Sequence, residues 1–398
     1  MKKKILFVMP SMHIGGAERS LLGLLDAFDY GKYDVNLFLY RHEGEFLQYI
    51  NPNVSLLPEI QQYKTFDVPV KSLLFSKRFI SGLLRIKAKV DQKIHKIRTG
   101  EDGVWMHMQK ISKNLQPIIP KIPGEYDMGI MFLGIPDTLV NKVDAKIKIA
   151  WNHTDYTTLG PDSEYDRKVY SLIDYIVSVS DESRNQFLKI YPEFREKAII
   201  IENILSKELI RQLAEEPVND MILYQHETCV LSIGRYSYAK NFDNIPDICK
   251  RILEKGQRVK WYIIGYGGDE QIIRDRIQES GMEDNVILLG KRINPYPYIK
   301  KCDIYIQPSR FEGKSVTVRE AQILGKPVII SDYATAQSQL ENGTDGIIVP
   351  QDNEKCASAI VSVLKNQTLC QLLSRNCTLK DYTNSDQMKK IESIIEEI

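Results

Sequence analysis

Short apolar runs alternate with longer amphipathic stretches along nearly the whole chain. Ile5–Met9 is an unbroken apolar run typical of a buried strand, and in Ala17–Phe28 the apolar residues recur at helical spacing. The pattern starts again with the apolar run Cys229–Ile233 and the helical stretch 242–255. Because strands that alternate with helices build parallel sheets, the sequence predicts an α/β fold with two doubly wound domains.

The two halves are expected to meet in a polar stretch around residues 202–220. An amphipathic tail at 385–398 predicts a final helix. We therefore expect domains at 1–205 and 206–380, followed by a helical segment at 381–398. The other expected strands are 35–40, 54–57, 146–151, 175–179, 197–202, 259–264, 286–290, 303–308 and 326–332.

Composition and charge narrow the class of protein. The chain has 398 residues with 53 Lys and Arg against 52 Asp and Glu, so no overall field favours nucleic acid as a partner. Six cysteines without a C-x2-C pair favour reduced thiols in a cytosolic protein over a zinc site. No apolar run approaches the ~18 residues of a membrane span, and the start MKKKILFVMP is better explained by a strand than by a secretory signal.

The stretch 303–332 contains the strongest candidate chemistry. It predicts a strand, a polar loop, a helix ending at Gly325 and a second strand, with Glu312 in the loop and Glu320 on the helix. Ligands bind at the carboxyl ends of such strands, and carboxylates can accept hydrogen bonds from sugar hydroxyls. The amides of three residues would face an anion at the helix N-terminus: Gly313, Lys314 and Ser315. The alternative is a pair of surface glutamates that cap a helix.

The longer sequence around these two glutamates resembles that of a known family. FEGKSVTVREAQILGKPVIISD followed by ENGTDGIIVP is similar, over about forty positions, to the E-x7-E signature of family 4 glycosyltransferases, retaining enzymes of the GT-B fold. The resemblance implies two Rossmann-like domains facing a central cleft, with a C-terminal helix that crosses back to the first domain. It also implies that Glu320 holds the ribose of a nucleotide donor, and that Glu312 and the amides after it hold the donor sugar. Lys314-Ser315 resembles the variant found in bacterial capsule and surface-polysaccharide transferases.

Two cations follow the first strand of the second half, in GRYSYAKNFD. Arg235 and Lys240 stand five residues apart in a loop between a strand and a helix, where they could neutralise a diphosphate. Solvated surface residues are the alternative. The spacing resembles the diphosphate clamp of the same family, which implies that both residues stabilise the leaving group.

Further candidates lie in the first half. Gly15 and Gly16 form a glycine turn before a helix, which either approaches a ligand or is an ordinary tight turn. His153 follows the strand 146–151, on the ligand side of a doubly wound sheet, and could equally be a structural histidine. The resemblance implies that the two glycines line the cleft, that His153 lies beside the donor sugar, and that Asn203 stands at the domain junction.

Residues 71–98 differ from the rest of the chain. They carry nine Lys and Arg against one Asp, with apolar residues at near-helical intervals. Such a helix can dock on an anionic membrane surface, or it can be a cationic helix whose apolar side packs on the domain. Family members that use lipid-linked acceptors favour docking at the inner face of the plasma membrane. The expected docking residues are Lys77, Arg78, Arg85 and Lys87.

Together these features predict a retaining glycosyltransferase that moves a sugar from a nucleotide-diphosphate donor, expected to be a UDP-sugar, to a glycan or lipid-linked acceptor of a bacterial surface polysaccharide. The chain lacks a D-x-D sequence, so we expect no metal and no cofactor beyond the donor. A UDP-sugar 2-epimerase shares the architecture and the donor class. A non-catalytic partner subunit of the same fold is a third interpretation, and a dehydrogenase is disfavoured because the full glycine fingerprint is missing.

Overall fold

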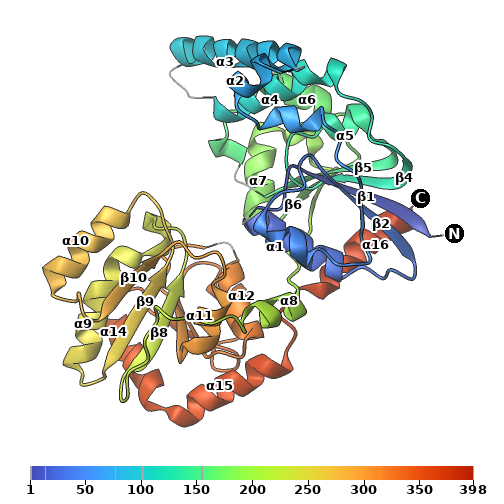
Figure 1. Ribbon diagram of the computed structural model, residues 1–398. Coiled ribbons are helices and arrows are strands. Elements are labelled where there is room, and N and C mark those ends of the chain that lie inside the picture. The colour runs from blue at the N-terminus through green and yellow to red at the C-terminus, as the bar shows by residue number, and fades with distance from the viewer. Residues whose placement is uncertain are drawn as a thin grey trace. The chain divides into compact units, whose positions relative to one another are not determined.

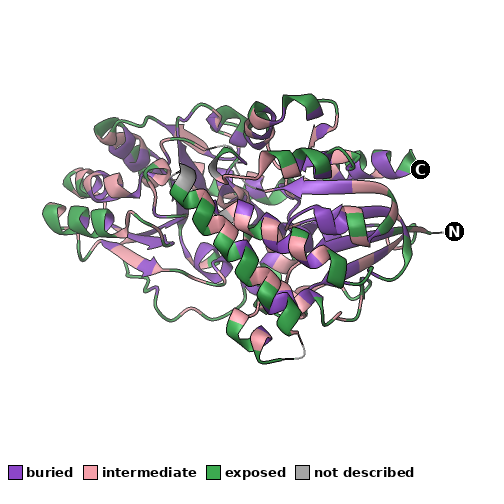
Figure 2. Ribbon diagram, turned by 90° about the horizontal axis from the view of Figure 1, so that it is seen from above, coloured by how far each residue is buried: buried purple, intermediate pink, exposed green. Residues whose placement is uncertain are grey.

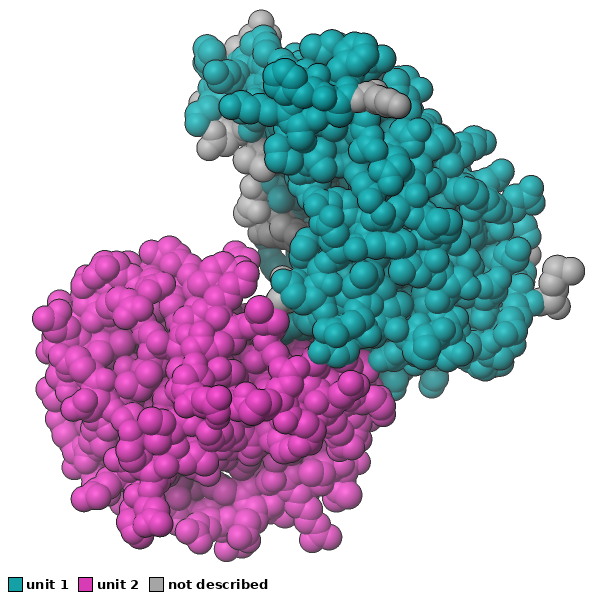
Figure 3. All heavy atoms as spheres, in the orientation of Figure 1, with its two compact units in different colours: residues 1–204, 385–398 teal, residues 205–384 magenta. Residues whose placement is uncertain are grey.

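The computed structural model of the chain describes residues 2–13, 15–76, 78–99, 103–153, 156–312 and 314–397. The chain forms two compact units, Met1–Ile204 with Ser385–Ile398 (unit 1) and Leu205–Asn384 (unit 2) (Figures 1 and 3). The sequence-based boundaries, after residues 205 and 380, differ from these by one and four residues.

Unit 1 is built on a seven-stranded sheet in the order β3-β2-β1-β4-β5-β6-β7, and every pair of neighbouring strands is parallel. The central strand β1 is completely buried from Ile5 to Met9, which explains its unbroken apolar sequence. Ile5 pairs with Val35 on one side and with Met128 on the other. The strands are β1 (Lys3–Met9), β2 (Tyr33–Leu39), β3 (Ser55–Leu56), β4 (Glu125–Met131), β5 (Asp144–Asn152), β6 (Tyr175–Ser178) and β7 (Ala198–Ile200).

Helices connect these strands and cover the sheet. The stretch 71–98, which we interpreted as one helix, forms two, because the chain turns at Ser76, whose hydroxyl accepts a hydrogen bond from the Arg78 amide at 3.1 Å. The helices of unit 1 are α1 (Gly16–Asp26), α2 (Val70–Leu74), α3 (Phe79–Thr99), α4 (Val104–Leu115), α5 (Asp137–Lys142), α6 (Ser163–Tyr170), α7 (Asp181–Ile190) and α16 (Met388–Glu396), with the short 3-10 helix η2 (Tyr63–Phe66).

Unit 2 repeats the plan with a six-stranded parallel sheet in the order β10-β9-β8-β11-β12-β13. Its inner strands β8, β11 and β12 are buried along nearly their whole length, whereas the edge strands β10 and β13 include partly exposed residues. Figure 2 colours the residues of both units by burial. The strands of unit 2 are β8 (Thr228–Ile233), β9 (Val259–Ile264), β10 (Val286–Gly290), β11 (Ile304–Gln307), β12 (Val328–Ser331) and β13 (Ile347–Val349).

The helices of unit 2 follow the strands in the same alternation. The expected helix 242–255 starts with a 3-10 turn, η7 (Phe242–Asn244), before α9 begins at Ile245. The helices are α8 (Lys207–Leu213), α9 (Ile245–Glu254), α10 (Glu270–Ser280), α11 (Tyr296–Lys301), α12 (Val316–Ile323), α13 (Ala336–Gln339), α14 (Asn353–Lys365) and α15 (Gln367–Leu379), with η6 at Tyr238–Lys240.

The last helix, α16, belongs to unit 1 although the segment before it belongs to unit 2. It buries Ile391, Ile394 and Ile395, and Lys390 Nζ donates to the Ile200 carbonyl after β7 at 2.8 Å. Two doubly wound α/β units and a returning C-terminal helix confirm the predicted fold class. Among the residues described, no helix is both long and apolar enough to cross a membrane.

Candidate functional site

The candidate site of unit 2 lies where β8 and β11 end. Lys240, the last residue of η6, forms an ion pair with Glu312 Oε1, and the Ser309 hydroxyl donates to the same oxygen at 2.8 Å. The Lys240 and Glu312 side chains are only 20% and 12% exposed. Two of the predicted residues are therefore direct partners, in a position where water screens their attraction only in part.

Local sequence holds the two loops together. A Cβ on Gly234 would lie 3.1 Å from Lys240 Cε, so the glycine leaves room for the lysine stem over the backbone. Asn241 adopts a left-handed conformation, with φ of 61°, and its side chain donates to the Pro308 carbonyl at 2.8 Å. Arg310 binds both carboxylate oxygens of Asp243, at 2.8 and 2.7 Å. The loop after β8 is thus bonded to the loop after β11 at several points.

A chain of buried hydrogen bonds leads from Glu312 back into β11. Gln307 Nε2 donates to the Ser309 hydroxyl at 3.0 Å, and the Tyr305 hydroxyl lies 2.6 Å from Gln307 Oε1. The same tyrosine oxygen lies 2.8 Å from the Thr317 hydroxyl, at the start of α12. Because Gln307, Ser309 and Tyr305 are fully buried, this network fixes the direction of the Glu312 carboxylate.

Glu320 lies on α12 and is completely buried. Its Oε1 accepts a hydrogen bond from the Tyr296 hydroxyl at 2.8 Å, and Tyr296 is the first residue of α11. A buried carboxylate with a dedicated donor is not a surface cap of a helix, so that alternative interpretation of Glu312 and Glu320 is wrong.

The N-terminus of α12 differs from the expectation. The Ser315 amide, which we expected to face an anion, donates instead to Gln339 Oε1 at 2.6 Å, and Gln339 Nε2 returns a bond to the Ser315 carbonyl at 3.3 Å. Gln339 reaches this amide from α13, a contact that no local pattern indicates. Lys314 is exposed, and Gly313 lies outside the described residues.

Arg235 lies two residues after the end of β8, and it is exposed, unlike Lys240. Its role as a second cation stays a prediction. Within the described ranges, no group of three or more His, Cys, Asp or Glu side chains could hold a metal ion.

The candidates of unit 1 lie in the segments that follow β1, β5 and β7. Gly15 precedes α1 in an extended conformation, and a Cβ there would lie 2.2 Å from Glu18 Oε2, whereas a Cβ on Gly16 would meet no atom within 4 Å. Gly15 therefore leaves room for the Glu18 carboxylate, while exposed Gly16 leaves open space at the start of the helix. Asn203 Oδ1 accepts a bond from the Ser20 hydroxyl of α1 at 2.8 Å.

His153 follows β5 and packs on Phe132, with ring centroids 4.7 Å apart. Its Nε2 lies 3.0 Å from the Phe132 carbonyl oxygen, which can only accept, so Nε2 carries a proton. Burial lowers the pKa of His153 to about 4. The ring is therefore neutral at pH 7, with Nδ1 unprotonated and able to accept a hydrogen bond.

Four side chains that support the site were missed in the sequence. Tyr296, Ser309, Gln307 and Gln339 act on Glu320, Glu312 and the Ser315 amide. The only signal in the sequence was position, because Gln307 ends the strand that precedes Glu312 and Ser309 lies in the loop after it. Tyr296 lies in a segment, NPYPYIKKC, whose sequence indicated no chemistry.

Sequence comparison relates part of the chain to known glycosyltransferases. Residues 219–379 match the family model of "Glycosyl transferases group 1". A Bacillus subtilis poly(glycerol-phosphate) alpha-glucosyltransferase is 31% identical over 144 residues, 36% of this chain and 21% of that protein. A Campylobacter jejuni 4-alpha-N-acetylgalactosaminyltransferase, named for a diphospho-undecaprenol substrate, is 28% identical over 187 residues, 47% of this chain and 49% of that protein. The chain spans less than half the length of these curated relatives.

Solved structures match over the full length of the chain. Anabaena HepE in complex with UDP and glucose has a TM-score of 0.60 and 17% identity, and the match covers 100% of both chains. A Staphylococcus aureus TarM variant in complex with UDP has a TM-score of 0.62 and 14% identity, with 99% of each chain covered. At such low identity these likenesses establish the fold. The chain has the GT-B fold of glycosyltransferases, and its second unit carries the group 1 sequence pattern.

Proposed function

We propose that this chain is a retaining, metal-independent glycosyltransferase of family 4 that transfers a sugar from a nucleotide-diphosphate donor, a UDP-sugar, in bacterial surface-polysaccharide synthesis. The acceptor is a glycan or a lipid-linked glycan. The fold and the group 1 match of residues 219–379 support this proposal, as do relatives named as a poly(glycerol-phosphate) glucosyltransferase and as a transferase for a diphospho-undecaprenol substrate.

The observation that carries it is the arrangement of Glu320, Tyr296, Glu312 and Lys240 in unit 2. A buried carboxylate whose direction is fixed by a hydroxyl is suited to accept hydrogen bonds from the vicinal hydroxyls of a ribose. Because Glu320 is fully buried, a ribose reaches it only after the side chains around it open. Glu312, fixed by Ser309 and Lys240, is suited to accept hydrogen bonds from the hydroxyls of the donor sugar.

Charge in this site favours a diphosphate as the leaving group. The Lys240–Glu312 pair is neutral as a unit, and an arriving diphosphate competes with Glu312 for the ammonium. Lys240 then stabilises the charge that develops on the departing nucleotide, with Arg235 as the proposed second cation. The roles of Gly15, Gly16, His153 and Asn203 rest on family resemblance and stay predictions.

A donor screen tests the proposal. A UDP- or GDP-sugar at about 100 times its Kd should add about 2.7 kcal/mol to the free energy of unfolding. Glu320→Gln should remove this stabilisation, whereas Glu283→Gln, at an exposed loop position of the same unit, should retain it. Donor turnover that needs no acceptor would favour the epimerase, and absence of donor binding by the unmodified protein would favour a non-catalytic partner.

We also propose that the enzyme works in the cytoplasm, peripherally bound to the inner face of the plasma membrane through α3. Apolar side chains three or four residues apart form a row on this helix, and each is 39–84% exposed. We call it the α3 row: Phe79, Leu83, Ile86, Val90, Ile94 and Ile97. The opposite face is the one that packs on unit 1, because Ser81 and Ala88 are buried there. The α3 row itself therefore does not pack against the rest of unit 1, although Leu84 of the same helix does.

Lysines flank the α3 row on both sides, at Lys87, Lys89, Lys93 and Lys96, and all four are exposed. An apolar row bordered by cations fits a bilayer that contains anionic lipid. The structure changes which of the four expected docking residues can contact a membrane. Arg85 turns inward and donates to the carbonyls of Thr65, at 3.2 Å, and Val68, and Arg78 donates to Gln61 at 2.7 Å. Lys77 lies outside the described residues, and Lys87 is retained.

A further inference from the structure

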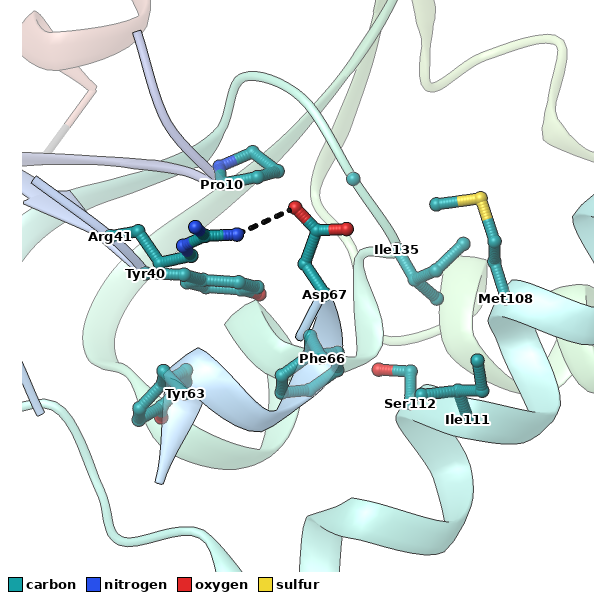
Figure 4. A pocket seen from close by; sticks show the side chains of 11 residues that line it. Pro10, Tyr40, Arg41, Tyr63, Phe66, Asp67, Met108, Ile111, Ser112 and Ile135 are labelled. Carbon is teal, nitrogen blue, oxygen red and sulfur yellow. Dashed lines mark hydrogen bonds and ion pairs between the residues drawn. The ribbon is translucent and has the colours of Figure 1, made fainter. Parts of the chain in front are cut away.

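Unit 1 contains a cavity of about 250 Å³ whose walls are mostly apolar. The engineered cavities of about 150 Å³ that take up benzene are smaller. Tyr40, Tyr63 and Phe66 form one side, with Tyr40 and Phe66 ring centroids 5.1 Å apart. Met108 and Ile111 of α4 lie opposite, and Ile135 comes from the loop after β4 (Figure 4). Nothing in the sequence singled out this group of residues.

The polar groups that line the cavity are already engaged. The Tyr63 hydroxyl donates to the Pro120 carbonyl at 2.9 Å, and the Ser112 hydroxyl donates to Asp137 at 2.6 Å. Arg41 bonds Asp67 at 3.1 Å (Figure 4). It also forms an ion pair with Glu43. A sugar or a phosphate would find few groups left to bind it, whereas a hydrocarbon needs none.

The wall of this cavity is bonded to the helix proposed to lie on the membrane. Arg85 of α3 donates to the Thr65 carbonyl at 3.2 Å and to the Val68 carbonyl, on either side of Phe66 and Asp67. The α3 helix also packs on α4, where Asn114 donates to the Leu84 carbonyl at 3.3 Å. Met108, which lines the cavity, is 43% exposed, so the cavity wall reaches the surface at α4.

We infer that this cavity binds the hydrocarbon chain of a lipid-linked acceptor, next to its glycan-bearing end. The inference rests on the proposed function only in identifying the bound hydrocarbon as part of the acceptor. The apolar side chains of the wall supply the binding free energy, and Arg41 stays at the polar rim with its two carboxylate partners.

The test uses a homologous series of alcohols, hexan-1-ol, octan-1-ol and decan-1-ol, titrated into the full-length protein by calorimetry. Each added pair of CH2 groups should lower Kd about fifteenfold until the cavity is full, because a buried CH2 contributes about fourfold. Met108→Glu should weaken decanol binding at least tenfold, and Leu172→Glu, at a residue 61% exposed elsewhere on unit 1, should leave it unchanged. If Met108→Glu does not fold, Ile135→Phe, which fills the cavity, replaces it.

A Kd that does not depend on chain length, or saturable glucose binding that Met108→Glu abolishes, would overturn the inference. UDP is titrated into the same proteins as a separate measurement. UDP binding without alcohol binding would refute the hydrocarbon site and leave the proposed function intact. Alcohol binding with the predicted chain-length dependence supports the site even if UDP fails to bind, a result that would count against the proposed function alone.

Discussion

The Tyr296 hydroxyl donates a 2.8 Å hydrogen bond to Glu320 Oε1, and both side chains are buried. Tyr296 opens α11 and Glu320 lies in the middle of α12, so this bond sets the direction of the carboxylate from outside its own helix. We therefore regard Tyr296 as a positioning residue for the proposed ribose contact.

Replacing Tyr296 by Phe should weaken donor binding about tenfold or more, because a hydrogen bond to a charged group contributes about 1.5–3 kcal/mol. Isothermal titration with UDP measures the change. Tyr298→Phe is the matched control, since Tyr298 donates to Asp220 at 2.7 Å from the same helix. Equal donor affinity in the Tyr296 variant and the unmodified protein would rule out the positioning role.

Lys240→Met should lower the free energy of unfolding by about 1–3 kcal/mol, because it leaves the largely buried Glu312 carboxylate without its cation. It should also reduce kcat/KM at least 100-fold, which corresponds to about 2.7 kcal/mol of transition-state stabilisation. Urea denaturation and initial rates measure the two effects.

Lys255→Met is a suitable comparison for Lys240→Met, because the Lys255–Glu354 pair is 31% and 51% exposed and should contribute about 0–1 kcal/mol. If both variants lost the same small amount of stability and kept full activity, the proposed role of the Lys240–Glu312 pair would be refuted.

His153 should make the folded state sensitive to acid. Burial lowers its folded pKa to about 4, whereas an unfolded histidine titrates near 6.5, so the unfolded chain binds the extra proton between these values. The stability present above pH 6.5 should fall by about 2 kcal/mol between pH 7 and pH 5 through this residue. His153→Asn should lack that loss, as chemical denaturation at the two pH values would show.

Two buried carboxyls act in the opposite direction. Burial raises the pKa of Asp137 and of Asp166 to about 6, so the folded state binds protons that the unfolded state takes up only at lower pH. These groups add stability as the pH falls from 6 towards 4. The histidine effect is therefore measured as the difference in free energy of unfolding between the unmodified protein and His153→Asn. If this difference were the same at pH 7 and pH 5, the predicted effect of His153 would be contradicted.

Membrane binding should depend on the lysines beside the α3 row. Replacing Lys87, Lys89, Lys93 and Lys96 by Gln should weaken binding to vesicles that contain anionic lipid by about fivefold per lysine, since each contributes about 1 kcal/mol. Lys121→Gln with Lys189→Gln, at exposed sites elsewhere on unit 1, is the control. Arg85→Gln should lower stability without a comparable effect on vesicle binding, because Arg85 bonds carbonyls of its own unit. If the four-lysine variant bound vesicles as tightly as the unmodified protein, the docking proposal would be refuted.

The apolar contribution of the α3 row to vesicle binding can be measured separately from the contribution of the lysines. Leu83→Ser and Val90→Ser should reduce vesicle binding and leave the free energy of unfolding within about 0.5 kcal/mol, because the side chains are 54% and 50% exposed. Sedimentation without lipid distinguishes a second possibility, pairing of two copies through this row. If the unmodified protein formed a dimer that these substitutions dissociate, and did not bind vesicles, the partner of the α3 row would be a second copy of the protein and not a membrane.

The fold could be predicted because apolar runs that are buried on both faces leave an unbroken signal in the sequence. Glu312, Glu320 and Lys240 could be selected because the motif that holds them is local. Tyr296 and Gln339 could not, because each acts on a residue of another helix and no spacing connects them. Arg85 could not be assigned correctly for the same reason. Its charge and its place in a basic helix suggested membrane docking, but it donates to a carbonyl that only the folded chain brings near.

The α3 row also affects how the purified protein behaves. Its six apolar side chains stay in water whenever no lipid is present, and contact with water is unfavourable for each of them. Solubility should consequently be lower in plain buffer than in a mild detergent, and salt that strengthens apolar association should precipitate the protein early. The surface that we propose to dock on a bilayer would thus make the protein difficult to concentrate.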